Sequence, residues 1–141
     1  MRTRTIALAL ALVLAGNHAQ ACKRVIQITL DFPKNSAQLE RAQIVRLANW
    51  LAEARGWFEY GDADVEGAAN GEIQGSKELA RRRAEVATHA LSSLYEGLPI
   101  HSSSHVYSTA DLRSNGDYAV VQLNPSNALD CNPVPIPGFK R

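Results

Sequence analysis

The sequence Val-Ile-Gln-Ile-Thr-Leu-Asp-Phe, residues 25–32, indicates the first element of the fold. Every second side chain in it is apolar, at Ile26, Ile28, Leu30 and Phe32. A period of two is typical of a β-strand that buries one face and exposes the other. Pro33 follows directly and ends the strand, because proline has no N–H to donate to a sheet.

The residues after this strand predict an amphipathic helix from about Ala37 to Arg55. Ser36 stands where an N-cap is expected, and Gly56 follows as a stop signal. The apolar side chains of this helix recur at helical spacing, at Leu39, Ile44, Leu47, Leu51 and Ala54. Four aromatic residues gather near its end and are expected to pack against the core: Trp50, Trp57, Phe58 and Tyr60.

A second strand is predicted to end at Glu66-Gly67, and a glycine-containing loop, residues 68–75, follows it. Ser76 is expected to cap a second helix of about residues 77–95, which Gly97-Leu98-Pro99 ends. The buried stripe of this helix is read from its spacing: Leu79, Arg83, Val86, Ala87, Ala90, Leu91 and Leu94.

Two further strands are predicted, the hydroxyl-rich Ile100–Ser108 and the strongly apolar Tyr118–Leu123. A turn expected at residues 114–117 would let these two strands pair as an antiparallel hairpin. Strands joined through helices imply parallel pairing elsewhere in the sheet. The order is β-α-β-α-β-β, so the sequence predicts an α/β sandwich with a mixed sheet.

The N-terminal residues 1–21 have the pattern of a secretory signal peptide. They open with Arg2 and Arg4, continue with an apolar stretch and end in the A-x-A site Ala19-Gln20-Ala21. The apolar stretch is shorter than the roughly 20 residues of a membrane-spanning helix, so a retained anchor is the weaker alternative. Removing Arg2 and Arg4 lowers the Lys+Arg count from 15 to 13 against 14 Asp+Glu. A processed chain of formal charge −1 is not a general binder of nucleic acid.

Both cysteines survive this processing, Cys22 as the first residue and Cys131 near the other end. Exported chains meet an oxidising compartment, so a disulfide between the two is the leading interpretation. Lipidation of Cys22 is the alternative, which fits less well because Ala19 stands where a lipoprotein signal usually has leucine. A single domain, residues 22–131, and a Pro-rich tail, residues 132–141, complete the predicted organisation.

Arg83 lies on the apolar stripe of the second predicted helix, four residues after Leu79 and three before Val86. A guanidinium does not lose its charge in proteins, so a buried one needs an anionic partner. One interpretation is a structural salt bridge, to Glu66, Glu72 or Asp64. The other is a ligand carboxylate held by the bidentate guanidinium fork.

These residues resemble OmpA-like domains, the type found at the C-terminus of OmpA and in Pal. The run Leu30-Asp31-Phe32, then Asn35-Ser36-Ala37-Gln38-Leu39, is similar to the family's first strand and helix start. Val65-Glu66-Gly67 is similar to the end of its second strand, and Leu79, Arg82-Arg83-Ala84 and Val86 to its second-helix motif. The resemblance covers about residues 25–108 and implies the same sandwich, with two helices on one face of the sheet.

The resemblance also implies a function, the non-covalent binding of peptidoglycan in the periplasm of a Gram-negative bacterium. In the family, an Asp after the second strand binds the ammonium of the diaminopimelate side chain, and an Arg on the second helix binds its carboxylate. Arg83 matches that Arg, but Asn70 stands where the family has its Asp. An amide brings no charge, so the expected loss in binding is about 1–3 kcal/mol.

Glu72 offers a replacement charge from the same loop, and Asn35, in the matched first motif, completes the candidate ligand-binding set. The last strand departs from the family as well, with Tyr118-Ala119-Val120-Val121 in place of an Asn-Arg-Arg-Val pattern. Peptidoglycan binding, weakened or altered, is therefore the first hypothesis. The alternative is an OmpA-like fold with a decayed wall site, serving as an interaction subunit of an envelope or secretion complex, or as a periplasmic inhibitor or immunity protein.

An enzyme is the least favoured class. On a strand, His101 and His105 would share a face about 13 Å apart, too far to bind one metal ion. The acidic residues Asp62, Asp64 and Glu66 alternate along another strand. We expect them to form a solvated edge rather than a metal site. Neither a nucleophile elbow nor a phosphate-binding glycine loop is recognisable. The sequence predicts no catalytic residue, no metal and no cofactor.

Overall fold

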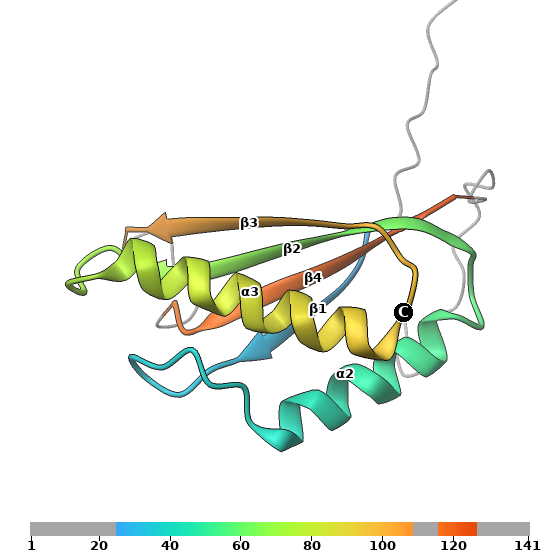
Figure 1. Cartoon of the computed structure of the whole chain (residues 1–141), viewed down its shortest axis with the longest axis horizontal. Coiled ribbons are helices and arrows are strands. Elements are labelled where there is room, and N and C mark those ends of the chain that lie inside the picture. The colour runs from blue at the N-terminus through green and yellow to red at the C-terminus, as the bar shows by residue number, and fades with distance from the viewer. Residues whose placement is uncertain (1–24, 109–115, 127–141) are drawn as a thin grey trace, which may run out of the picture.

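The structure is a computed structural model that describes residues 25–108 and 116–126. The elements follow the predicted β-α-β-α-β-β order. They are β1 (Ile26–Asp31), α2 (Arg41–Ala54), β2 (Tyr60–Asn70), α3 (Ser76–Leu94), β3 (Ile100–Tyr107) and β4 (Tyr118–Pro125). Both helices lie on one side of a twisted sheet (Figure 1), so the predicted α/β sandwich is confirmed.

The four strands are ordered β1-β4-β2-β3. Strand β3 runs parallel to β2, while β4 is antiparallel to both β1 and β2, which makes the sheet mixed as predicted. The expected hairpin between the last two strands is wrong, because β4 lies between β1 and β2. Burial explains this placement: Ala119, Val121 and Leu123 of β4 are fully buried, whereas the hydroxyl-rich β3 tolerates an edge.

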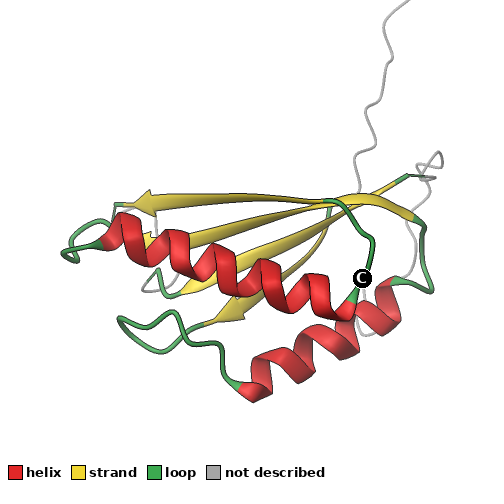
Figure 2. Ribbon diagram, in the orientation of Figure 1, coloured by secondary structure: helices red, strands yellow, loops and turns green. Residues whose placement is uncertain are grey.

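The core fills the space between the sheet and the two helices (Figure 2). Alternate residues of the strands, including Leu30, Val65 and Val121, are buried there together with Leu47 and Leu91 of the helices. The aromatic group predicted near the end of α2 behaves as expected: Tyr60 belongs to the core, and Trp50, Trp57 and Phe58 pack against it. The opposite face of the sheet is left uncovered by every element that the structure describes.

Helix α2 begins at Arg41, later than predicted, and Ser36 is not its N-cap. The Ser36 hydroxyl oxygen instead accepts a hydrogen bond from the Gln38 N–H at 3.0 Å, and Glu40 occupies the N-cap position. The reason lies outside the helix, because the Ser36 carbonyl accepts a hydrogen bond from the Arg83 side chain at 2.8 Å. This contact ties the segment before α2 to α3.

Strand β2 continues past the predicted end at Gly67 and reaches Asn70. The parallel neighbour β3 extends it, since Ala68, Ala69 and Asn70 are in register with residues 105–107. Gly67 is therefore not a stop signal. It is a point of close approach, where a Cβ would lie 2.1 Å from the Ala80 carbonyl oxygen on α3.

Helix α3 starts at Ser76, so Ser76 is its first residue and Gly75, at φ 76°, takes the N-cap position. No helix in residues 25–108 and 116–126 is both long and apolar enough to cross a membrane. The predicted signal peptide 1–21, the tail 132–141 and both cysteines, Cys22 and Cys131, lie outside the described residues. The proposed cleavage, the domain limits and the disulfide stay predictions.

Candidate functional site

Arg83 is the centre of the candidate site. Its exposed fraction is 0%, and it is the largest fully buried side chain among the described residues. The helix-stripe prediction that placed this arginine toward the core is therefore confirmed. A buried guanidinium carries five N–H donors and a permanent charge, so its partners define what the site can do.

Every guanidinium nitrogen of Arg83 has an acceptor within the chain itself. Nε donates to the Ser36 carbonyl at 2.8 Å, and Nη1 donates to the carbonyls of Ala68 and Gly116 at 2.9 and 3.0 Å. Nη2 donates to Asp117 Oδ1 at 2.7 Å and makes a long contact of 3.5 Å with the Pro33 carbonyl. The guanidinium is thus satisfied from three separate parts of the sequence.

The fold brings these parts together through the contact between α3 and β2. Because Gly67 has no side chain, the backbone of α3 at Ala80 and Ala84 lies directly against β2. Arg83, on the same face of the helix, then reaches the Ala68 carbonyl next to Gly67. The ring of Phe32, the residue that follows β1, has its centroid 5.5 Å from the guanidinium carbon, within the range of a cation–π contact.

The anionic partner that Arg83 requires is Asp117, whose side chain is 15% exposed. The partners suggested from the sequence, Glu66, Glu72 and Asp64, are wrong. The sequence does not predict this partner, because Asp117 directly precedes β4 and its position depends on where β4 lies in the sheet. With β4 placed between β1 and β2, its first residues arrive beside α3.

The other three predicted ligand residues do not contact Arg83 through any hydrogen bond in the described part of the chain. Asn70, at the end of β2, uses its Oδ1 to accept a hydrogen bond from the Glu72 N–H at 3.0 Å. Glu72 itself is exposed in the loop that follows. Asn35 is exposed in the turn after β1, with a positive φ of 55°. The ligand role of all four residues remains a prediction.

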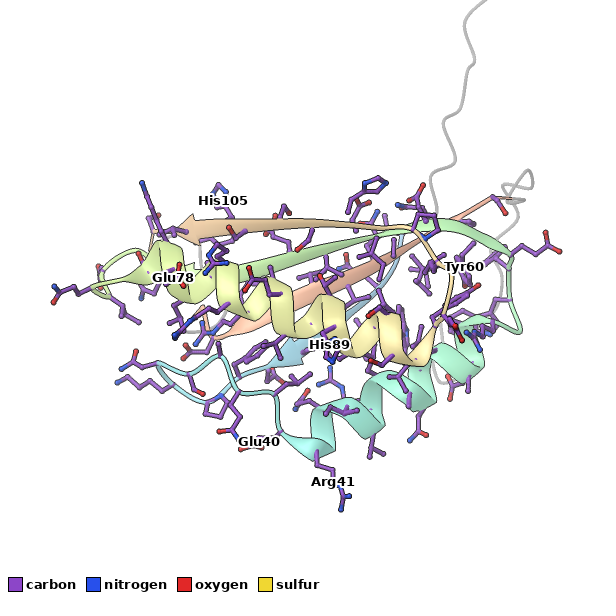
Figure 3. All side chains as sticks on the ribbon, viewed as in Figure 1. Glu40, Arg41, Tyr60, Glu78, His89 and His105 are labelled. Carbon is purple, nitrogen blue, oxygen red and sulfur yellow. The ribbon has the colours of Figure 1, made fainter. Side chains whose placement is uncertain are left out.

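The side of the sheet away from the helices carries a second group of polar residues, which we call the open face. It is formed by alternate residues of three strands: Asp62, Asp64 and Glu66 of β2, His101, Ser103, His105 and Tyr107 of β3, and Tyr118, Val120, Gln122 and Asn124 of β4. The acids therefore lie on an interior strand rather than on the expected edge. Figure 3 shows His105 at the margin of the sheet, away from the helices.

Each of the three carboxylates of the open face accepts a hydrogen bond from an uncharged side chain. The Asn124 side-chain amide donates to Asp62 Oδ1 at 2.5 Å and to Asp64 Oδ2 at 2.7 Å, and the Tyr107 hydroxyl donates to Glu66 Oε1. This last bond is the main reason that the pKa of Tyr107 is raised to about 12. The residues described include no group of His, Cys, Asp and Glu side chains arranged to hold a metal ion.

Comparison with solved structures shows a likeness of the fold. The chain is similar to the solved OmpA-like domain of FopA1 from Francisella tularensis subsp. tularensis SCHU S4, with 16% sequence identity and a TM-score of 0.47. The match covers 73% of this chain and 77% of that one. No family model matches the sequence, and neither does any curated protein.

Proposed function

We propose that this chain is an exported, non-enzymatic binding module of the cell envelope whose partner is another protein. The observation that carries the proposal is the enclosure of Arg83. Its side chain is fully buried, and each guanidinium nitrogen donates to a group of the chain itself. The OmpA-like resemblance assigns Arg83 to the binding of a wall carboxylate. Its guanidinium instead bonds to groups of the chain itself and so stabilises the fold.

The energetics favour this interpretation over a working wall site. A diaminopimelate carboxylate would have to replace Asp117 on Nη2, which exchanges one charge-assisted bond for another of similar strength. The ammonium of the same ligand would meet Asn70 in place of a carboxylate, a loss of about 1–3 kcal/mol or ten- to a hundredfold in affinity. Little net free energy then remains to bind a peptide stem.

Peptidoglycan binding is the second candidate, and one observation favours it. The side chain of Asp117 is 15% exposed, and its carboxylate lies 2.7 Å from Arg83. The guanidinium is therefore already paired with a carboxylate that reaches it from the surface. In this alternative, the stem carboxylate displaces Asp117, and Glu72 supplies the charge that Asn70 lacks. Export to the periplasm, proposed from residues 1–21, is common to both candidates.

Co-sedimentation with purified peptidoglycan sacculi separates the two candidates. We expect the wild-type protein to stay in the supernatant, together with an Arg82→Gln control altered at an exposed neighbour of Arg83. The double variant Asn70→Asp, Asp117→Asn restores the family's acid and weakens the internal competitor. If Asp117 only blocks the site, this variant gains binding that free diaminopimelate competes away.

Sedimentation of the wild-type protein with sacculi, reversed by free diaminopimelate, would overturn the proposed function in favour of the second candidate. Sedimentation that diaminopimelate does not reverse would overturn it too, since the wall would then be bound elsewhere on the surface.

A further inference from the structure

Strand β3 forms one edge of the sheet, and β2 is its only partner among the described residues. Figure 1 shows it along the side of the sheet away from α2. The central residues of β3, from His101 to His105, are all exposed. An edge strand of this kind leaves one row of backbone N–H and C=O groups free to pair with another chain.

Two hydrogen bonds identify which groups of β3 face the free edge. The carbonyls of Pro99 and Tyr107 accept from the N–H groups of Ala63 and Gly71, at 2.9 and 2.8 Å. Backbone groups point to alternate sides along a strand, so the odd-numbered residues of β3 bond to β2. The even-numbered residues point their N–H and C=O groups outward: Ile100, Ser102, Ser104 and Val106.

Three features that often protect an edge strand, namely lysine, proline and a β-bulge, are missing from β3. Its sequence, Ile-His-Ser-Ser-Ser-His-Val-Tyr, contains no lysine and no proline. Its pairing with β2 runs without interruption from Ile100 to Tyr107, whereas β2 and β4 show a register shift between Tyr60 and Asp62. A regular edge strand of eight residues, exposed over its central five, is able to accept a further strand.

The open face beside this edge is acidic. Within residues 25–108 and 116–126, no lysine or arginine forms an ion pair with Asp62, Asp64 or Glu66. Glu66 is in register with Ser103, whose side chain is small, and the Tyr107 hydroxyl also donates to Glu66. A long cationic side chain from an added strand therefore has a path across Ser103 to Glu66.

We propose that β3 is a docking edge for an extended, basic segment of a partner protein. The segment adds a fifth strand to the sheet, and lysine or arginine at its alternate positions lies over the open face toward Glu66 and Asp64. A second copy of this chain is a poorer occupant, because it brings the same carboxylates and no compensating charge. This inference rests on the proposed function as a protein-binding module.

The test uses a capped nine-residue peptide of alternating lysine and threonine, with a glutamate–threonine peptide as the matched control. We expect the lysine peptide to slow amide hydrogen exchange at least tenfold at Ser102 and Ser104 of the full processed protein, measured by NMR. The amide of Ser103 already bonds to β2, so it serves as an internal reference that changes little. The glutamate peptide should leave all three amides unchanged.

Two sets of variants distinguish the contribution of the β3 backbone from that of the acidic side chains on the open face. Ser104→Pro removes an outward N–H that the sheet does not use, and it should abolish protection, while Ser104→Thr keeps the N–H and should retain it. The double variant Asp64→Asn, Glu66→Gln leaves the backbone intact, and it should weaken binding of the lysine peptide about tenfold or more. This second set decides the question even if the proline variant does not fold.

Equal protection by both peptides, or binding that Ser104→Pro leaves intact in a folded variant, would overturn the proposal. So would slow exchange at Ser102 and Ser104 in the free, dilute protein, because another segment or a second copy would then already cover the edge. These outcomes leave the proposed function standing. That function fails instead if the wild-type protein binds sacculi, a result that does not depend on β3.

Discussion

The Arg83 guanidinium nitrogen Nη2 lies 2.7 Å from the carboxylate oxygen of Asp117, although the two residues are 34 positions apart in the sequence. This ion pair occurs at a place where the sequence alone suggested a ligand. A carboxylate of the chain itself pairs with the buried arginine, so the isolated domain needs no ligand to balance that charge.

Arg83→Met is expected to destabilise the protein by about 3–5 kcal/mol, because Asp117 and several carbonyls lose their partner in a buried place. Urea unfolding followed by far-UV circular dichroism measures this loss. Arg82→Met is the matched control, since the Arg82 side chain is 61% exposed, and it should change stability by no more than about 0.5 kcal/mol. Equal losses in the two variants would contradict a structural role for Arg83.

Gly67→Ala should cost roughly 3 kcal/mol or more, because the new Cβ would lie 2.1 Å from the Ala80 carbonyl and 2.4 Å from the Ala84 nitrogen. The control is Gly61→Ala on the same strand, where the nearest atom is 3.6 Å away. We expect that control to stay close to the wild type in thermal unfolding. A Gly67→Ala protein of wild-type stability would show that α3 does not lie directly on β2.

Thr88→Val should stabilise the protein by about 1 kcal/mol. Among the described residues, the Thr88 hydroxyl is a buried polar group with no hydrogen-bond partner, and valine has the same shape without the unmet donor. Thr88→Ser keeps the hydroxyl and removes the methyl group, so it should lower stability instead. Chemical denaturation of the three proteins compares them, and a loss of stability in the valine variant would argue for a partner that the hydroxyl reaches.

Stability should fall between about pH 10 and 12, because burial raises the pKa of Tyr60 to about 12 while an unfolded tyrosine ionises near 10. The contribution is complete below pH 10 and is lost as the pH rises toward the folded-state pKa. Tyr60→Phe removes this titration, so its free energy of unfolding should decline less steeply across that range. Tyr107, with its pKa also raised to about 12, should leave a residual slope.

At neutral pH the same Tyr60→Phe variant should be less stable by about 1 kcal/mol, since the Tyr60 hydroxyl donates to the Ala54 carbonyl at 2.7 Å. Urea unfolding at a series of pH values between 8 and 12 records both effects. Parallel pH profiles for the wild type and the variant would contradict the assignment to Tyr60.

The elements of this fold could be predicted because their signals are local. The alternation of residues 26–32 and the helical spacing around Leu47 and Leu91 depend only on neighbouring residues. Sheet order is not local, and the hairpin predicted between β3 and β4 was wrong because burial, rather than a short connection, decides where β4 lies. The extension of β2 to Asn70 similarly depends on its pairing with β3.

In the candidate site as well, local features could be predicted from the sequence and those that depend on the tertiary fold could not. The helical phase of Arg83 identified a buried charge and the need for an anion, and both are found. The identity of that anion depends on the position of β4 in the sheet, so Asp117 could not be predicted from the sequence. The backbone carbonyls of Ser36, Ala68 and Gly116 were beyond prediction altogether, because a carbonyl is present at every position and its availability depends on the tertiary fold.

Three segments share Arg83: the turn before α2, the end of β2 and the residues that lead into β4. None of them is able to open without exposing part of the same buried charge, so their local unfolding is coupled. We expect these segments to behave as one cooperative unit, with amide exchange rates that rise and fall together when conditions change. A protein that binds any one of them will therefore alter the dynamics of the other two.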